Sequence, residues 1–168
     1  QYRLKTLQEL EASREGFHQA VKAIMQKVES EDEFGAGIHG PLAELINVPQ
    51  KYEKAIEVTL GAALHNIVTS TKADASRMIE WLKQTRSGRE TFLPLDTIRA
   101  RYVSEHDLKR IEQQSGFLSI ASTIVGFSEE YTEIIGQLLG RVIIAENLEQ
   151  ALKISAEIRQ KYKVVTLA

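Results

Sequence analysis

The chain has 168 residues, of which 43% are hydrophobic and 26% are charged. This length suits one ordinary domain or two small subdomains that share a core, and the composition is not that of a disordered chain. The absence of cysteine excludes disulfides and thiolate zinc sites. A net charge of −2 excludes a chain-wide positive field. Because no signal peptide or membrane-length apolar run occurs, we expect a cytoplasmic location, and the start at Gln1 indicates a piece of a longer protein.

Residues 1–33 are predicted to form a long coiled-coil helix. Residues 1–28 contain no Pro and a single Gly, at position 16, and their apolar side chains recur on a seven-residue repeat. Only one charged residue interrupts this seam, which consists of Leu7, Leu10, Arg14, Phe17, Val21, Ile24 and Val28. A second helix would cover such a seam, and the alternative is an amphipathic helix that packs on its own domain. An acidic run at 29–33 and the glycines that follow end the helix.

A duplicated unit follows this helix. Residues 52–61 (YEKAIEVTLG) and 131–140 (YTEIIGQLLG) share a leading Tyr, helical spacing and a closing Leu-Gly. In each copy a β-branched strand comes next, then an amphipathic helix and a final strand. This pattern predicts an α+β fold of two sheet-and-helix subdomains related by a pseudo-two-fold axis. We place the subdomains at 34–115 and 116–168.

Between the copies, residues 104–114 are predicted to form one more helix. Ser104 is a candidate N-cap, and Asp107 stands where a capping box has Glu. Residues 116–126 are apolar but carry Ser and Thr, so their state is ambiguous, and we interpret them as a connector into the second subdomain. Three glycines are assigned to structural turns: Gly61, Gly88 and Gly140.

The sequence offers little catalytic chemistry. Residues 35–40 spell G-x-G-x-x-G, but an acidic stretch precedes them where a dinucleotide site needs a buried strand, so we favour a flexible joint. No phosphate loop and no G-x-S-x-G elbow occur. His18, His39, His65 and His106 lack metal-ligand spacing. We expect no enzyme, no cofactor and no metal site.

Two segments carry a local positive charge. Residues 81–110 hold seven basic and four acidic residues, and residues 151–163 hold four basic residues and one acidic residue. Such patches can bind phosphates, with Trp81, Phe92 or Tyr102 available to stack a base. The candidate DNA-binding residues are Lys83, Arg86, Arg89, Arg99, Arg101, Lys109, Arg110, Lys161 and Lys163. The alternative is a set of solvated helix faces, with Trp81 in the core.

Several ordered motifs resemble the hinge domain of bacterial SMC (structural maintenance of chromosomes) proteins. They are GIHGPLAELI at 37–46, the Leu-Gly helix at 52–61, GRETFLPL at 88–95, LLGRV at 138–142 and VVTL at 164–167. The resemblance implies a homodimerisation module in the middle of a long ATPase, joined through two interfaces. It also implies DNA binding by basic residues near the coil junction. The family usually continues into a glycine-rich stretch that contributes to the dimer interface, so we expect this fragment, which ends at Ala168, to dimerise less completely.

Two functions remain open from the sequence. The first is homodimerisation for chromosome condensation and segregation, accompanied by DNA binding. The second is a module that mainly holds single-stranded DNA and dimerises secondarily. The expected partners are a second copy, DNA and the rest of the SMC chain through the coiled coil, and no membrane. Salt distinguishes the two functions, because phosphate contacts weaken steeply with ionic strength while a strand-paired interface does not.

Overall fold

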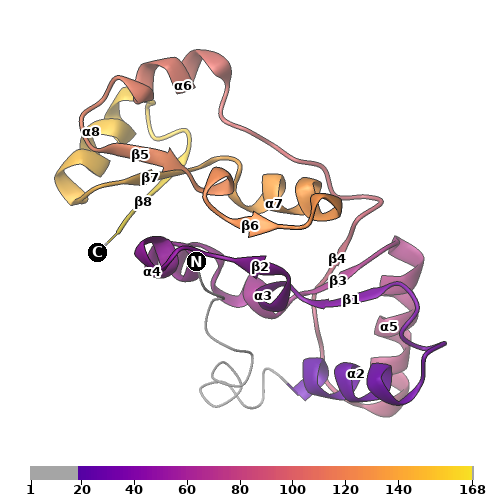
Figure 1. The fold of residues 1–168 in the computed structure, drawn as a ribbon. Coiled ribbons are helices and arrows are strands. Elements are labelled where there is room, and N and C mark those ends of the chain that lie inside the picture. The colour runs from indigo at the N-terminus through magenta and orange to yellow at the C-terminus, as the bar shows by residue number, and fades with distance from the viewer. Residues whose placement is uncertain (1–18, 168) are drawn as a thin grey trace. The chain divides into compact units, whose positions relative to one another are not determined.

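The structure, a computed structural model, describes residues 19–167 (Figure 1). The seam positions Leu7, Leu10, Arg14 and Phe17 therefore lie outside the described residues. The described chain divides into two compact units, which are treated separately below. The N-terminal unit contains residues 19–46 and 62–98, and the C-terminal unit contains residues 47–61 and 99–167.

The N-terminal unit is a three-stranded sheet with two main helices. Its sheet has the order β1–β3–β4, in which β1 runs antiparallel to β3 and β3 runs parallel to β4. The elements in chain order are α2 (Gln19–Ser30), β1 (Ile38–Pro41), α3 (Leu42–Leu45), β2 (Ile46–Asn47), which ends at the unit boundary, η2 (Gly61–His65), which begins at the next boundary, β3 (Ile67–Thr69), α5 (Lys72–Thr85) and β4 (Phe92–Pro94).

The C-terminal unit repeats this plan. Its sheet has the order β5–β7–β8, with β5 antiparallel and β8 parallel to the central strand β7. The elements in chain order are η1 (Gln50–Tyr52), α4 (Glu53–Leu60), α6 (Glu105–Glu112), β5 (Phe117–Ile120), η3 (Ala121–Thr123), β6 (Gly126–Phe127), η4 (Glu129–Tyr131), α7 (Thr132–Leu139), β7 (Val142–Ala145), α8 (Leu148–Glu157) and β8 (Lys163–Thr166). In Figure 1, α6 and α8 lie beside this sheet.

The helix–strand–helix–strand unit predicted from the sequence occurs twice along the chain. Each Tyr-to-Gly motif forms a helix, α4 or α7, and is followed by a strand, a helix and a second strand parallel to the first. The sequence missed the first strand of each sheet. The flexible joint predicted at 35–40 overlaps β1, and the ambiguous connector at 116–126 contains β5. Pro41 fits β1 because that strand lies at the edge of its sheet.

The unit boundaries differ from the predicted subdomains at 34–115 and 116–168. The division falls between residues 98 and 99, and α4 belongs to the C-terminal unit. There α4 contacts β8, which lies about a hundred residues later in the sequence. Contacts between such distant segments decide the division, and a linear repeat does not reveal them.

Helix α2 packs against its own unit. Val21 and Ile24 are fully buried in a core that includes Ile67, Met78 and Leu82. Val28, the next seam position, packs against the same core. Over residues 19–30 this packing matches the alternative, an amphipathic helix on its own domain, and the coiled coil over residues 1–33 stays a prediction. The apolar stripe of α2 covers its own sheet and α5 and is not left open to a partner helix.

Candidate functional site

An apolar groove lies at the edge strand of the C-terminal unit. It has a volume of about 410 Å³ and is lined by Lys54, Val58, Leu148, Ala151, Leu152, Ser155 and Val164–Thr166. Three of its side chains are strongly exposed: Val58 by 62%, Leu148 by 68% and Leu152 by 63%. They come from α4 and from the first half of α8. A contiguous exposed apolar surface beside an edge strand is typical of a protein interaction site.

A second groove, which we call the cationic groove, lies at the end of α5. It has a volume of about 560 Å³ and is lined by Ile79, Leu82, Lys83, Arg86, Gly88, Arg89 and Glu90. Arg86 is the C-cap of α5. It adopts a left-handed conformation with φ 52° and donates its backbone N–H to the carbonyl oxygens of Leu82 and Lys83. Gly88 also has positive φ. This tight turn brings Lys83, Arg86 and Arg89 around one groove.

The one acidic residue in this groove is already engaged. The Glu90 carboxylate lies 3.0 Å from Nδ1 of His65, and both side chains are almost completely buried. Glu90 also accepts the backbone N–H of Thr91. Lys83, Arg86 and Arg89 are exposed and form no ion pair with another described residue. The groove therefore presents three cations to solvent beside partly apolar walls.

The other six predicted DNA-binding residues belong to the C-terminal unit and do not line the cationic groove. Arg110 is paired with Glu157 at 2.8 Å, and Lys161 is paired with Asp107 at 3.2 Å. These pairs reduce the positive charge that the two residues offer to a phosphate. Arg99 and Arg101 are exposed on the segment before α6, Lys109 on α6 and Lys163 at the start of β8. The cationic groove therefore contains only Lys83, Arg86 and Arg89 of the nine candidates.

The aromatic candidates for base stacking do not line either groove. Trp81 packs edge to face on Phe34, with ring centroids 5.2 Å apart, and belongs with Phe92 to the apolar core of the N-terminal unit. This agrees with the alternative interpretation of Trp81. Tyr102 is 55% exposed but lies in the C-terminal unit, against Gly136.

A buried polar network around Asp107 was not predicted. Ser104 caps α6 by accepting the N–H of Asp107, as the sequence indicates. The Asp107 carboxylate does not close a capping box, because it accepts hydrogen bonds from the Tyr162 hydroxyl at 2.7 Å and from Lys161. The hydrogen bonds from Tyr162 and Ser104 outweigh burial and, with Lys161, lower the pKa of Asp107 to about 2. The network joins α6 to the segment before β8.

The remaining motifs carry no reactive site in the described part of the chain. The G-x-G-x-x-G run leads into β1 and does not join a strand to a helix, so it does not match a dinucleotide site. Residues 19–167 hold no group of three or more His, Asp or Glu side chains that could bind a metal. Among the same residues, no helix has the length and apolar character needed to cross a membrane.

The turn glycines have different physical roles. Gly61 and Gly140 end the matched helices α4 and α7, as predicted. Gly61 has φ 48°, and an added Cβ would meet nothing within 4 Å. Gly140 has an ordinary helical φ, but a Cβ there would lie 2.2 Å from the backbone oxygen of Arg101. Glycine is therefore required for conformation at position 61 and for space at position 140.

Comparison with known proteins identifies the family. Residues 35–155 match the family described as SMC proteins Flexible Hinge Domain. The chain is 38% identical over 161 residues to the chromosome partition protein Smc of Bacillus subtilis, covering 96% of this chain and 13% of that protein. It is 36% identical over 165 residues to the Smc protein of Lactiplantibacillus plantarum, covering 98% of this chain and 14% of that one. The chain thus spans about one seventh of these relatives.

Solved structures show the same fold. An asymmetric dimer of the Geobacillus stearothermophilus SMC hinge domain matches with a TM-score of 0.83 and 39% identity, covering 96% of this chain and 64% of that one. The Pyrococcus furiosus Smc hinge domain with an extended coiled coil matches with a TM-score of 0.72 and 27% identity, covering 95% and 55%. The duplicated sheets and these similarities confirm the resemblance seen in the sequence. This chain belongs to the flexible hinge domain family of SMC proteins, among the bacterial members.

Proposed function

We propose that this chain is the homodimerisation hinge of a chromosome-partitioning SMC ATPase, with a second copy docking on the apolar groove beside β8. The observation that carries the proposal is the exposure of Val58, Leu148 and Leu152 next to a strand edge. Among the described residues, β8 pairs with β7 and has no strand on its other side. The related Geobacillus hinge forms a dimer, which makes a second copy the natural occupant.

The energetics favour burial of this groove. Removing an aliphatic side chain from water contributes about 1.5–3 kcal/mol. A free strand edge also offers backbone N–H and C=O groups that another chain can pair with. Because apolar and strand-paired contacts respond weakly to salt, we expect dimerisation to persist at high ionic strength. The domain itself is proposed to do no chemistry.

Leu152→Glu tests this interface. The substitution places a charge in the groove, and Leu152 is too exposed for the change to disturb the core. We expect the dimer to weaken at least tenfold in sedimentation equilibrium, with an unchanged circular dichroism spectrum. Gln137→Glu is the matched control, because it adds one negative charge at an exposed position of α7 in the same unit that does not line the groove. A Leu152→Glu protein that dimerises like the wild type would contradict the proposal.

We also propose that the cationic groove binds DNA. The grouping of Lys83, Arg86 and Arg89 supports this activity, and the adjoining Ile79, 41% exposed, gives an unstacked base an apolar surface. Three phosphate contacts on a single strand predict a slope of about −2 for the logarithm of affinity against the logarithm of salt concentration. If DNA retention were the main function and dimerisation secondary, DNA binding would survive loss of the dimer.

Charge reversal separates the two activities. Replacing Lys83, Arg86 and Arg89 with Glu is expected to abolish binding of a single-stranded oligonucleotide in a fluorescence anisotropy titration and to leave the dimer intact. The matched control reverses Arg101, Lys109 and Lys163, three exposed cations of the C-terminal unit. Equal losses in both triple variants would show that binding follows net charge and not the groove.

A further inference from the structure

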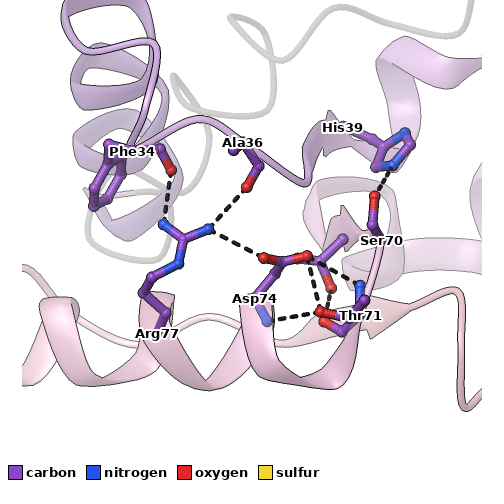
Figure 2. Close-up of polar contacts among 8 residues, drawn as sticks. Phe34, Ala36, His39, Ser70, Thr71, Asp74 and Arg77 are labelled. Atoms are coloured by element: carbon purple, nitrogen blue, oxygen red, sulfur yellow. Dashed lines mark hydrogen bonds and ion pairs between the residues drawn. The ribbon is translucent and has the colours of Figure 1, made fainter.

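A single arginine binds the segment between α2 and β1, residues 31–37, which we call the link. Arg77 lies on α5 and donates hydrogen bonds from Nη1 to the carbonyl oxygen of Phe34 and from Nη2 to that of Ala36, both at 2.8 Å. Nη2 also contacts Oδ1 of Asp74 at 3.2 Å. Figure 2 shows the guanidinium between these three acceptors. One side chain therefore connects α5 to the segment that reverses the chain after α2.

Asp74 is held in place to receive this arginine. Its Oδ2 accepts the backbone N–H of Thr71 at 3.2 Å and the Thr71 hydroxyl at 2.9 Å, and its own N–H donates to Thr71 Oγ1 (Figure 2). This capping box fixes the first turn of α5. Burial alone would raise the pKa of Asp74, but the hydrogen bonds from Thr71 and Arg77 and the charge of Arg77 lower it overall. The carboxylate is therefore an oriented anion at neutral pH.

The link is shaped to fit this pair closely. Gly37 has φ +81°, and a Cβ added there would lie 2.2 Å from Oδ2 of Asp74. Its carbonyl oxygen accepts the N–H of Ser70 at 2.8 Å. In β1, the strand that follows the link, His39 Nε2 lies 2.9 Å from Oγ of the same Ser70 (Figure 2). The glycine segment is thus fixed on both sides, although the sequence suggests a flexible joint.

Helix α2 is consequently attached to its unit at two points. The first is the apolar contact of Val21 and Ile24 with the core. The second is the link itself, where Phe34 stacks edge to face on Trp81 and lies below Arg77 at 5.8 Å. A helix attached at one cluster can pivot about it, while a second attachment also fixes its direction. Charge-assisted, bidentate hydrogen bonds from arginine have the directionality needed for this task.

We propose that Arg77, oriented by Asp74, is a positioning residue that fixes the direction of α2 against the β1–β3–β4 sheet. The helix and the sheet then move as one rigid body. A rotation of α2 therefore rotates the sheet with it and is not absorbed by bending of the link. The consequence for the arms of an SMC protein rests on the proposed function. The fixed direction of α2 does not depend on it.

A distance measurement tests the role of Arg77. The chain lacks cysteine, so Gln26→Cys on α2 and Gln84→Cys on α5 introduce two unique label sites, both exposed. Double electron–electron resonance on the spin-labelled chain, diluted with unlabelled protein, is expected to give one narrow distance distribution. Arg77→Ala should at least double the width of this distribution. Arg77→Lys supplies one point charge in place of the planar fork and should give an intermediate width.

Two further variants make the test specific. Lys83→Ala removes an exposed cation from the same helix and should leave the distribution unchanged. Gly37→Ala displaces the link with Arg77 intact and should broaden the distribution as Arg77→Ala does. A narrow, unshifted distribution in folded Arg77→Ala or Arg77→Lys protein would overturn the proposal. Leu152→Glu should disrupt the dimer and leave this distance unchanged, so failure of the dimer proposal is recognised separately.

Discussion

At the scale of single residues, several polar side chains join elements of the fold through hydrogen bonds. Asp107 shows this most clearly, because its carboxylate is shared by Tyr162 and Lys161 at a join between α6 and the segment before β8. The Tyr162 hydroxyl also accepts the N–H of Ser104. A buried carboxylate needs such donors, since an unsatisfied charge away from water is strongly destabilising. The lowered pKa of Asp107 is therefore explained by its hydrogen bonds at this structural join.

The same network makes stability sensitive to acid. The folded-state pKa of Asp107, about 2, lies below its ordinary value of 3.8, so its contribution is complete above pH 4 and is lost as the pH falls towards 2. Tyr162→Phe should lower the thermal midpoint at neutral pH by about 5 °C, because Asp107 loses a hydrogen bond.

Asp107→Asn should reduce the dependence of the free energy of unfolding on pH between pH 4 and pH 2, as measured by urea unfolding. A profile as steep as that of the wild type would show that other carboxylates control it.

Glycine at positions 136 and 140 illustrates a spatial requirement at the same scale. The chain at 100–103 runs along α7, donating the N–H groups of Arg101 and Val103 to the carbonyl oxygens of Gly136 and Gly140. A Cβ at position 136 would lie 2.4 Å from the Cβ of Ala100. The other copy of the repeat has Glu57 at the position of Gly136. The two matched helices thus differ where an extended segment lies against one of them.

At the scale of elements, α2 shows how one pattern fits two partners. An apolar stripe at heptad spacing is also a stripe with i, i+3 and i+4 neighbours, and either a second helix or a sheet can cover it. In residues 19–30 the sheet and α5 do so. The acidic turn after α2 remains as predicted, but Arg77 and the capping box of α5 hold the chain that follows it.

Burial of this stripe has a measurable consequence. Ile24 is fully buried in the core of the N-terminal unit, so Ile24→Ala should reduce the free energy of unfolding by about 3 kcal/mol. Gln26→Ala, at an exposed position of the same helix, should change it by less than about 0.5 kcal/mol. Chemical denaturation of both variants checks this. If Ile24→Ala unfolded like the wild type at every protein concentration, the packing of α2 on its unit would be refuted.

At the scale of the whole molecule, the chain is an internal duplication that contains two three-stranded sheets of the same plan. Both sheets place an antiparallel strand, a central strand and a parallel strand in the same order. The helices, the second and third strands of each copy and the cap at Ser104 follow from periodicity and from Ser, Gly and β-branched residues. Strand β1 does not, since Ile-His-Gly-Pro has the composition of a turn and becomes a strand by pairing with β3.

The candidate sites follow the same division between local and distant information. Three of the predicted cations lie close together because they are neighbours at one helix end, where local sequence is sufficient. The apolar groove joins α4, α8 and β8, which lie far apart in the chain, so no motif revealed it. The pairing of Arg110 with Glu157 and of Lys161 with Asp107 was hidden for the same reason.

The sequence by itself determined the duplicated α+β plan, the family resemblance and the lack of a recognised catalytic motif, because these depend on short-range periodicity and on residue order. Tertiary structure alone decided that α4 joins the later unit, that the stripe of α2 is covered by its own sheet, and that Arg77 fixes the link after it. Those outcomes depend on which distant surfaces fit together. Packing and hydrogen-bond geometry select that fit, and spacing along the chain does not encode it.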